Sequence, residues 1–304
     1  MTTSFQSSRA IGAMLLGSLL WGLTWLPIKH FGAVGLTGIT LTLCTYGVIG
    51  ALALPFIALR FPAWKSQSGL LLLAALFGGI ANSTFVTALM NGNVTRSMLL
   101  FYLIPVWGVL GGRIFLGETV SRTRCLAVVL SIAGALLVLG GPQTLSGPLD
   151  GNDLLSLAAG FFYTAQNIAF RAADRIPATI KSMAVFAGCG VVAVAVLPLT
   201  SHSLPPINAA LALQLAAFGF LWLSLAMLAS TYGVSHLEAG RAAVLVVFEL
   251  VTAVVSAMVV GGERLDAMGW IGAVLMVSAA LLEARSAAAP TPHPTLLPAP
   301  ARHD

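Results

Sequence analysis

Long apolar runs dominate the pattern of hydrophobic and polar positions along the chain. Crossing the hydrocarbon core of a bilayer as an α-helix takes about 20 apolar residues, and ten runs approach that length. Short segments that carry proline, glycine or charge separate them, so we expect almost no residues outside the membrane core. The predicted spans, numbered 1 to 10 in this order, are residues 10–28, 36–59, 68–90, 96–116, 124–141, 153–170, 179–199, 207–232, 239–261 and 267–284.

The apolar runs predict helices rather than the strands of a barrel. Barrel strands alternate apolar and polar residues over about ten positions, whereas residues 70–76 read Leu-Leu-Leu-Leu-Ala-Ala-Leu. Composition agrees with a lipid-embedded chain, because 58% of the residues are hydrophobic and 8% are charged. Soluble proteins carry roughly a quarter charged residues. The sequence therefore predicts an all-α membrane protein with ten transmembrane helices.

The net charge of +5 is a topology signal rather than a sign of a nucleic-acid partner. If the N-terminus is cytoplasmic, 12 of the 15 Lys and Arg residues fall in inside segments and only Lys29, Arg96 and Arg264 fall outside. Basic residues concentrate on the cytoplasmic side of membrane proteins. We therefore predict that both termini are cytoplasmic and that the chain resides in the plasma membrane, the inner membrane of a bacterium.

An internal repeat relates the two halves of the chain. Residues 96–139 align with residues 241–284 at a shift of 145 without a gap, so that Gly117-Glu118 meets Gly262-Glu263. Residues 18–25 align with residues 156–163 at a shift of 138. Each repeat then holds five spans, and an odd number forces the second copy to enter the membrane from the opposite side. Inverted repeats of this kind recur in secondary transporters.

The repeat sets the predicted domain boundaries. Residues 1–145 form the first five-span repeat, and residues 146–286 form the second, inverted one. Residues 287–304 contain five prolines and predict a disordered tail.

These motifs resemble the EamA-type branch of the drug/metabolite transporter superfamily. The resemblance rests on Ile104-Pro105 running to Leu116-Gly117-Glu118, and on Glu249-Leu250 running to Gly262-Glu263. The first copy has Ile where the family pattern has Glu, and the second has Leu where the pattern has Pro. Within the family the chain is most similar to the YddG-type aromatic amino-acid exporters. The resemblance implies export of amino acids or related metabolites by a ten-span, two-repeat fold.

Polar and aromatic residues inside the spans are the candidates for a binding site, because such groups are costly in lipid and usually face a partner helix or a cavity. Amides and hydroxyls suit the charged groups of a zwitterion, and aromatic faces suit an apolar side chain or an ammonium. The alternative is that these residues only join helices. Pro27 predicts a kink in the first span, just after Trp25. The candidates are Trp21, Trp25, Tyr46, Asn82, Phe85, Tyr102, Tyr163, Gln166 and Asn167.

Glu249 is the acidic residue predicted near the middle of a span. A carboxyl group in apolar surroundings is easily protonated, so Glu249 is a candidate for proton coupling; alternatively it ties span 9 to a neighbour. Cys44, Cys125 and Cys189 all fall in predicted spans and indicate buried thiols, without metal spacing or a disulfide framework. We expect no catalytic residues, no metal, no cofactor and no obligatory protein partner.

Three functional classes remain open at this stage. The first is a secondary exporter of amino acids, with efflux of quaternary amines or drugs as the alternative substrate class. The second is an intramembrane enzyme acting on lipid-linked substrates, which would need a compact acid, base or nucleophile cluster. The third is a pore, which would need a continuous polar stripe. The sequence offers isolated polar patches, and these favour the exporter, with a small molecule and membrane lipid as its expected partners.

Overall fold

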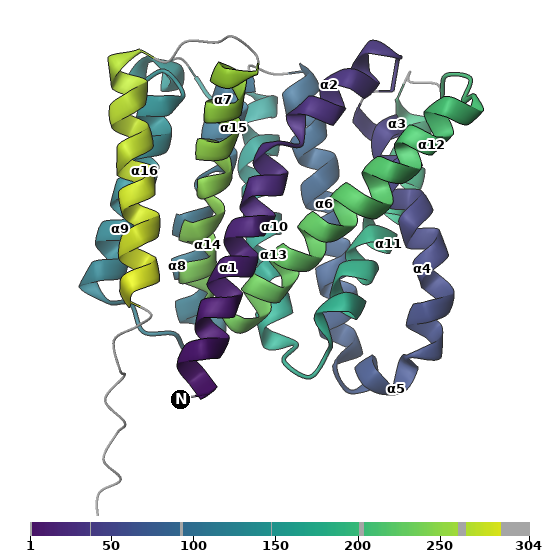
Figure 1. Cartoon of the computed structure of the whole chain (residues 1–304), viewed down its shortest axis with the longest axis horizontal. Helices are drawn as coiled ribbons and strands as arrows, with labels where there is room; N and C mark the ends of the chain where they lie inside the picture. The colour runs from purple at the N-terminus through teal and green to yellow at the C-terminus, as the bar shows by residue number, and fades with distance from the viewer. Residues whose placement is uncertain are drawn as a thin grey trace, which may run out of the picture.

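The structure is a computed structural model, and it describes residues 2–36, 38–91, 94–146, 148–200, 204–260 and 266–286. Throughout these residues the chain forms helices and no β-strand (Figure 1). The second Gly-Glu pair, Gly262-Glu263, and the proline-rich tail, residues 287–304, lie outside the described residues.

The first half contains five helical stretches, several of them built from more than one segment. They are α1 (Thr2–Gly22) with α2 (Trp25–Ala33); α3 (Gly38–Thr42), the π-helical η1 (Leu43–Gly47) and α4 (Val48–Leu59); α6 (Ser68–Asn91), preceded by the short α5 (Phe61–Trp64); α7 (Val94–Phe101) with α8 (Ile104–Phe115); and α9 (Arg122–Val138).

The second half repeats this organisation. Its stretches are α10 (Gly151–Ala172); α11 (Ala178–Val196); α12 (Ala209–Ala217), the π-helical η5 (Phe218–Leu223) and α13 (Ser224–His236); α14 (Ala239–Val246) with α15 (Phe248–Val259); and α16 (Ala267–Ser286). Helices therefore occupy all ten ranges that the sequence predicts as spans.

Six stretches of the described chain are long and apolar enough to cross a membrane, which confirms a polytopic helical protein. The other four ranges are helical, but α9 has only 17 residues and a break separates α14 from α15. That these four also cross the membrane stays a prediction. The six stretches that are long and apolar enough to cross are Ser7–Ala33, Gly38–Leu59, Phe61–Ala88, Ser97–Phe115, Ala178–Leu199 and Ala209–His236.

The two halves are intertwined rather than side by side. Helix α1 packs on α13, α14 and α15 of the second half, and α10 packs on α6, α7 and α8 of the first. The last helices, α9 and α16, pair with each other at one edge of the molecule (Figure 1). Helices α1 and α10, which begin the two halves, thus each pack on helices of the opposite half.

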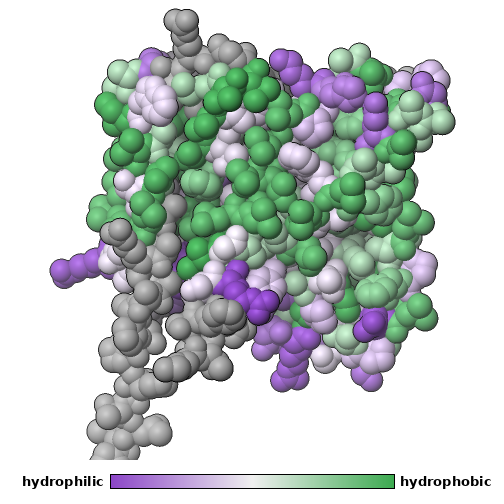
Figure 2. All heavy atoms as spheres, in the orientation of Figure 1, coloured by the Kyte–Doolittle hydropathy of each residue, from purple (hydrophilic) through white to green (hydrophobic). Residues whose placement is uncertain are grey.

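The surface confirms that lipid surrounds the protein. Hydrophobic residues form a broad band over the face shown in Figure 2, and hydrophilic residues gather at its two ends. Large apolar side chains such as Ile114, Leu213 and Val259 are 70%, 73% and 80% exposed. Exposed apolar area of this extent marks a protein whose solvent is not water. It also corrects the prediction for the thiols: Cys189 is buried, but Cys44 is half-buried and Cys125 is exposed, because burial in lipid does not require burial in protein.

A charged cluster joins the end of span 4 to the start of span 9. The buried Arg124 guanidinium donates to Glu238 and lies 3.8 Å from the Glu118 carboxylate. The same carboxylate accepts from the backbone N–H of Ala239 at 2.7 Å, at the first residue of α14. A carboxylate at a helix N-terminus satisfies its free N–H groups and favours its dipole. The Glu of the first Gly-Glu motif therefore caps a helix of the other repeat.

Candidate functional site

Three of the helical stretches break near their middle, and the breaks lie close to the predicted site residues. Helix α1 ends at Gly22 and α2 begins at Trp25; α7 ends at Phe101 and α8 begins at Ile104; α14 ends at Val246 and α15 begins at Phe248. Irregular backbone at membrane depth is tolerated only where protein buries it or where it lines a cavity. The breaks therefore locate the candidate functional site.

The break in span 1 is satisfied by side chains. The Thr24 N–H bonds to the carbonyl of Trp21, three residues back, so the Leu20 carbonyl loses its helical partner. The Thr24 hydroxyl donates to that carbonyl at 2.7 Å, and the Trp222 indole N–H of η5 donates to it at 3.1 Å. The predicted kink at Pro27 thus appears as a break just before it, with the proline in the first turn of α2, where its missing N–H costs no bond.

The breaks in spans 4 and 9 fall at the same repeat position, because Tyr102 and Val247 differ by the shift of 145. Pro105 accounts for the first break: it has no N–H to offer the Phe101 carbonyl, four residues back. The second break forms although Leu250 stands at the equivalent position. Local sequence therefore does not explain the break in span 9, and its packing against the other helices must stabilise it.

Two equivalent glycines, Gly22 and Gly160, let the first helix of each half approach a broken span of the other half. A Cβ on Gly22 would lie 2.5 Å from the Glu249 carbonyl oxygen, and one on Gly160 would lie 2.7 Å from the Phe101 carbonyl oxygen. Any side chain larger than hydrogen would therefore push these helices apart. This close approach fixes spans 1 and 9, and spans 6 and 4, around one centre.

Glu249 lies at that centre, in contact with one predicted tyrosine and within electrostatic range of two others. The Tyr102 hydroxyl donates to its carboxylate oxygen Oε1 at 3.2 Å. Tyr46 of η1 and Tyr163 of α10 both lie close enough to interact with the same carboxylate electrostatically. The three phenols come from three different stretches of the chain, and that of Tyr102 contacts the carboxyl group.

Aromatic rings form one side of this cluster. The Phe101 ring centroid lies 4.3 Å from that of Phe85, 5.4 Å from that of Tyr102 and 5.8 Å from that of Tyr163. On the other side, the Tyr46 ring lies 5.2 Å from that of Phe186. The sequence analysis did not select Phe101, which connects the other rings. Its only sequence signal is its position beside Tyr102, four residues before the helix-breaking Pro105.

Both predicted tryptophans of span 1 are held by serines of the second half. The Trp25 indole N–H donates to Ser256 Oγ on α15 at 2.9 Å, and that of Trp21 donates to Ser230 Oγ on α13 at 3.2 Å. These bonds fasten the two sides of the span 1 break to spans 9 and 8. The serines had no sequence signal, because a lone serine in an apolar helix does not reveal its partner.

The predicted amides are distributed over two environments. Asn167 lies one turn from Tyr163 on α10, and Asn82 accepts from the Thr42 hydroxyl at 3.1 Å. Gln166 is instead buried where α10 crosses α6, with its amide oxygen over Gly78. The structure thus places Asn167 with the tyrosine cluster, whereas Gln166 has the position of a residue that joins two helices.

The side chains at this site supply groups that can bind a small molecule. One carboxylate can hold a proton or an ammonium group, three phenols can donate or accept hydrogen bonds, and aromatic faces can take an apolar group. Among the described residues no group of three or more His, Cys, Asp or Glu side chains is arranged to hold a metal ion. Broken helices that meet around an ionisable group are the binding-site architecture of secondary transporters.

Comparison with known proteins identifies the class. The EamA-like transporter family matches the chain twice, over residues 8–140 and 152–284. The chain therefore belongs to this family and carries two copies of its domain, so it is an integral membrane transporter of small solutes. No curated protein matches the chain.

Solved structures support the fold. One of the 28 matching chains, described as "Crystal structure of protein", covers 92% of this chain and 99% of its own length with a TM-score of 0.73. Its sequence identity is 20%, so this likeness concerns the fold alone.

Proposed function

We propose that the protein exports amino acids with aromatic or other apolar side chains, or closely related metabolites, across the cytoplasmic membrane by alternating access. The observation that supports this most directly is the single carboxylate of Glu249 among Tyr46, Tyr102 and Tyr163, at the meeting point of the broken spans 1, 4 and 9. This arrangement offers complementary groups for each part of such a solute.

The parts of the solute match the site as follows. Its ammonium group would bind the adjacent aromatic faces and the amide oxygen of Asn167, while Glu249 would carry the coupling proton. Its apolar side chain would lie against Phe85 and Phe101, whose rings are 4.3 Å apart. Its carboxylate would need donors, and the Asn167 amide and the tyrosine hydroxyls are placed to supply them. Trp21 and Trp25 would close the site from span 1, and Asn82 from span 3.

The test is transport by the purified protein in liposomes. We expect saturable counterflow of radiolabelled aromatic and branched-chain amino acids from preloaded vesicles. Saturation and counterflow distinguish a carrier from a pore, and an enzyme would give no flux. Counterflow of quaternary amines but of no amino acid would contradict the proposed substrate class and favour drug efflux instead.

Tyr163→Ala and Trp25→Ala are expected to weaken transport of aromatic substrates. An aromatic contact contributes about 0.5–1.5 kcal/mol, which corresponds to a rise in KM of roughly 2- to 12-fold. The matched control is Trp270→Ala, since Trp270 on α16 is 52% exposed on the outer surface. If Trp270→Ala raised KM and both site variants left it unchanged, the binding site would lie elsewhere.

The proposal includes inverted repeats with both termini in the cytoplasm. Ser146 in the connection between the halves and Asn152 at the start of α10 are then extracellular, because five spans precede them. Cysteine substitutions at Ser146 and Asn152 should react with a membrane-impermeant reagent in intact cells. Reaction only after the cells are opened would contradict both the orientation and the inversion.

A further inference from the structure

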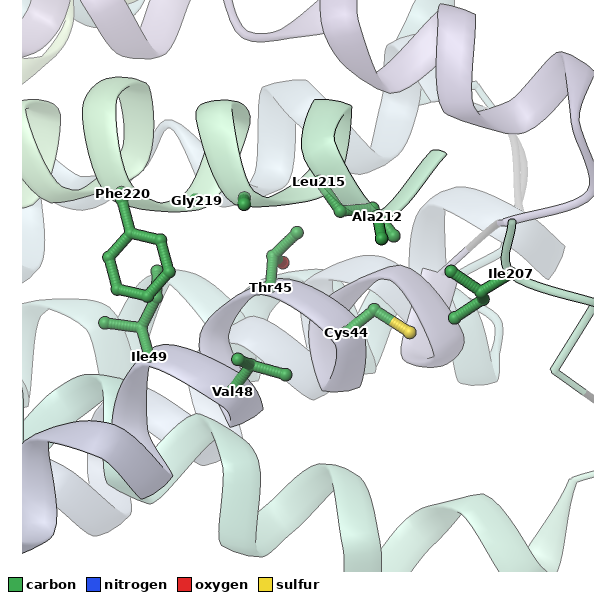
Figure 3. A pocket seen from close by; sticks show the side chains of 10 residues that line it. Cys44, Thr45, Val48, Ile49, Ile207, Ala212, Leu215, Gly219 and Phe220 are labelled. Atoms are coloured by element: carbon green, nitrogen blue, oxygen red, sulfur yellow. The ribbon is translucent and has the colours of Figure 1, made fainter. Parts of the chain in front are cut away.

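A cavity of about 220 Å³ separates span 2 from span 8, away from the aromatic cluster (Figure 3). In the close-up, Phe220 extends from its helix toward Ile49 at one end, and Thr45 points from η1 toward the opposite helix. The remaining walls come from the same two stretches and the connection before α12, among them Cys44, Val48, Ile207 and Leu215.

The walls of this cavity define the chemistry of its ligand. Nearly all of them are hydrocarbon, and the Thr45 hydroxyl already donates to the Leu41 carbonyl of its own helix at 2.7 Å. A water molecule needs two to four polar partners to remain in a cavity, and apolar cavities stay dry. The cavity is therefore suited neither to water nor to a zwitterion, but to an apolar chain.

The position of the cavity in the bilayer indicates where such an apolar ligand would come from. Cys44 to Ile49 lie near the middle of the candidate span Gly38–Leu59, and the opposite wall belongs to the candidate span Ala209–His236. The neighbouring side chains face outward: Leu213 is 73% exposed, Leu221 is 72% exposed and Val48 is 48% exposed. At this depth of a bilayer the surrounding solvent is the acyl chains of phospholipids.

The equivalent helix interface, formed by the corresponding spans of the opposite repeats, has no such cavity. Spans 7 and 3 are the repeat mates of spans 2 and 8, and there α11 and α6 pack backbone to backbone: a Cβ on Gly79 would lie 2.6 Å from the Gly188 carbonyl oxygen. Those two helices are regular, whereas spans 2 and 8 both change to π-helix, η1 and η5, where they border the cavity. Single-turn π-helices are rare and occur often at functional sites.

We propose that this cavity is a lipid site that binds an acyl chain of a membrane phospholipid between spans 2 and 8. The chain supplies van der Waals contacts along the part of the interface where the two helices leave a cavity. The two π-helical segments shape the walls that receive it. The proposal of a lipid site does not depend on the proposed amino-acid site: evidence against one of the two sites would not be evidence against the other.

A photoreactive phosphatidylcholine tests the proposal. The lipid carries a diazirine midway along one acyl chain, and the wild-type protein is illuminated in nanodiscs that contain it. Mass spectrometry then locates the adducts. We expect a several-fold higher yield on η1 and η5 than on the lipid-facing residues Ile271 and Val274 of α16, which are 52% and 61% exposed. An equal or lower yield on η1 and η5 would overturn the proposal.

Filling the cavity provides the second measurement. A Cβ on Gly219 would lie 3.1 Å from Ile49 Cδ1, so Gly219→Leu should remove the excess labelling while α16 is labelled as before. The matched control is Gly69→Leu, where a Cβ meets no atom within 4 Å. If the purified Gly219→Leu protein is not monodisperse, the labelling is measured instead on Ala212→Leu, which fills the cavity from the same wall. Labelling of η1 and η5 that persists in the folded, filled variant would also overturn the proposal.

Discussion

Replacing Glu249 with glutamine is expected to abolish the pH dependence of transport while substrate binding changes little. Glutamine keeps the shape of the side chain and can keep the hydrogen bond from Tyr102, but its amide does not titrate. If Glu249 exchanges a proton for the substrate, an inward proton gradient should accelerate export by the wild type and leave Glu249→Gln unaffected. Transport in liposomes with imposed pH gradients, together with equilibrium binding, measures the two effects separately.

Asp174→Asn is the control for this experiment. Asp174 is an exposed carboxylate in the connection between α10 and α11, where hydrogen bonding to Gln67 lowers its pKa. It lies outside the aromatic cluster, so its loss should leave the response to the gradient intact. An unchanged pH profile in a folded Glu249→Gln protein would return Glu249 to a structural role. It would leave the amino-acid site itself to be judged by counterflow.

Arg124→Gln is expected to be the most destabilising of these substitutions. The Arg124 side chain is 6% exposed and lies between the carboxylates of Glu118, 10% exposed, and Glu238, 39% exposed. Removing one partner of a buried ion pair costs about 3–5 kcal/mol, because the remaining charge is left uncompensated. The more exposed Glu238 remains partly solvated, so we expect the lower end of that range.

The loss should appear as a lower unfolding midpoint in detergent, measured by intrinsic fluorescence. Arg122→Gln is the matched control, since Arg122 is exposed on the same helix two residues away, and it should behave like the wild type. The double variant Arg124→Gln/Glu118→Gln should recover part of the loss, because it removes the charge that the single variant leaves buried. Equal midpoints for Arg124→Gln and Arg122→Gln would show that the cluster contributes little.

The sequence indicated individual candidate residues of the site, but not which of them lie together in space. Tyr46, Tyr102, Tyr163 and Glu249 were each recognisable, because a polar group in an apolar span is costly and seeks a partner. Tyr102 and its hydrogen-bond partner Glu249 are 147 positions apart, and no pattern along the chain states that they meet. For the same reason Gln166, adjacent to Asn167, could not be separated from the cluster until its position over Gly78 was known.

The breaks show a second limit. Pro105 made an interruption of span 4 foreseeable, because proline removes a backbone hydrogen bond. The equivalent break in span 9 has no proline, and the break in span 1 depends on an indole from η5, about 200 residues away. These irregularities form because the groups that satisfy them come from other helices.

The sequence by itself determined that this chain is a helical membrane protein with two related halves. Those properties follow from composition, run length and repeated motifs, since lipid admits few backbone structures and each must satisfy its own polar groups. Only the tertiary structure decided which side chain contacts Glu249, where the spans break, and that a cavity lies between spans 2 and 8 while spans 3 and 7 pack closely. Such features depend on packing between residues distant in the chain. The uniform hydrophobicity that identifies a span gives no information about which neighbour it will meet.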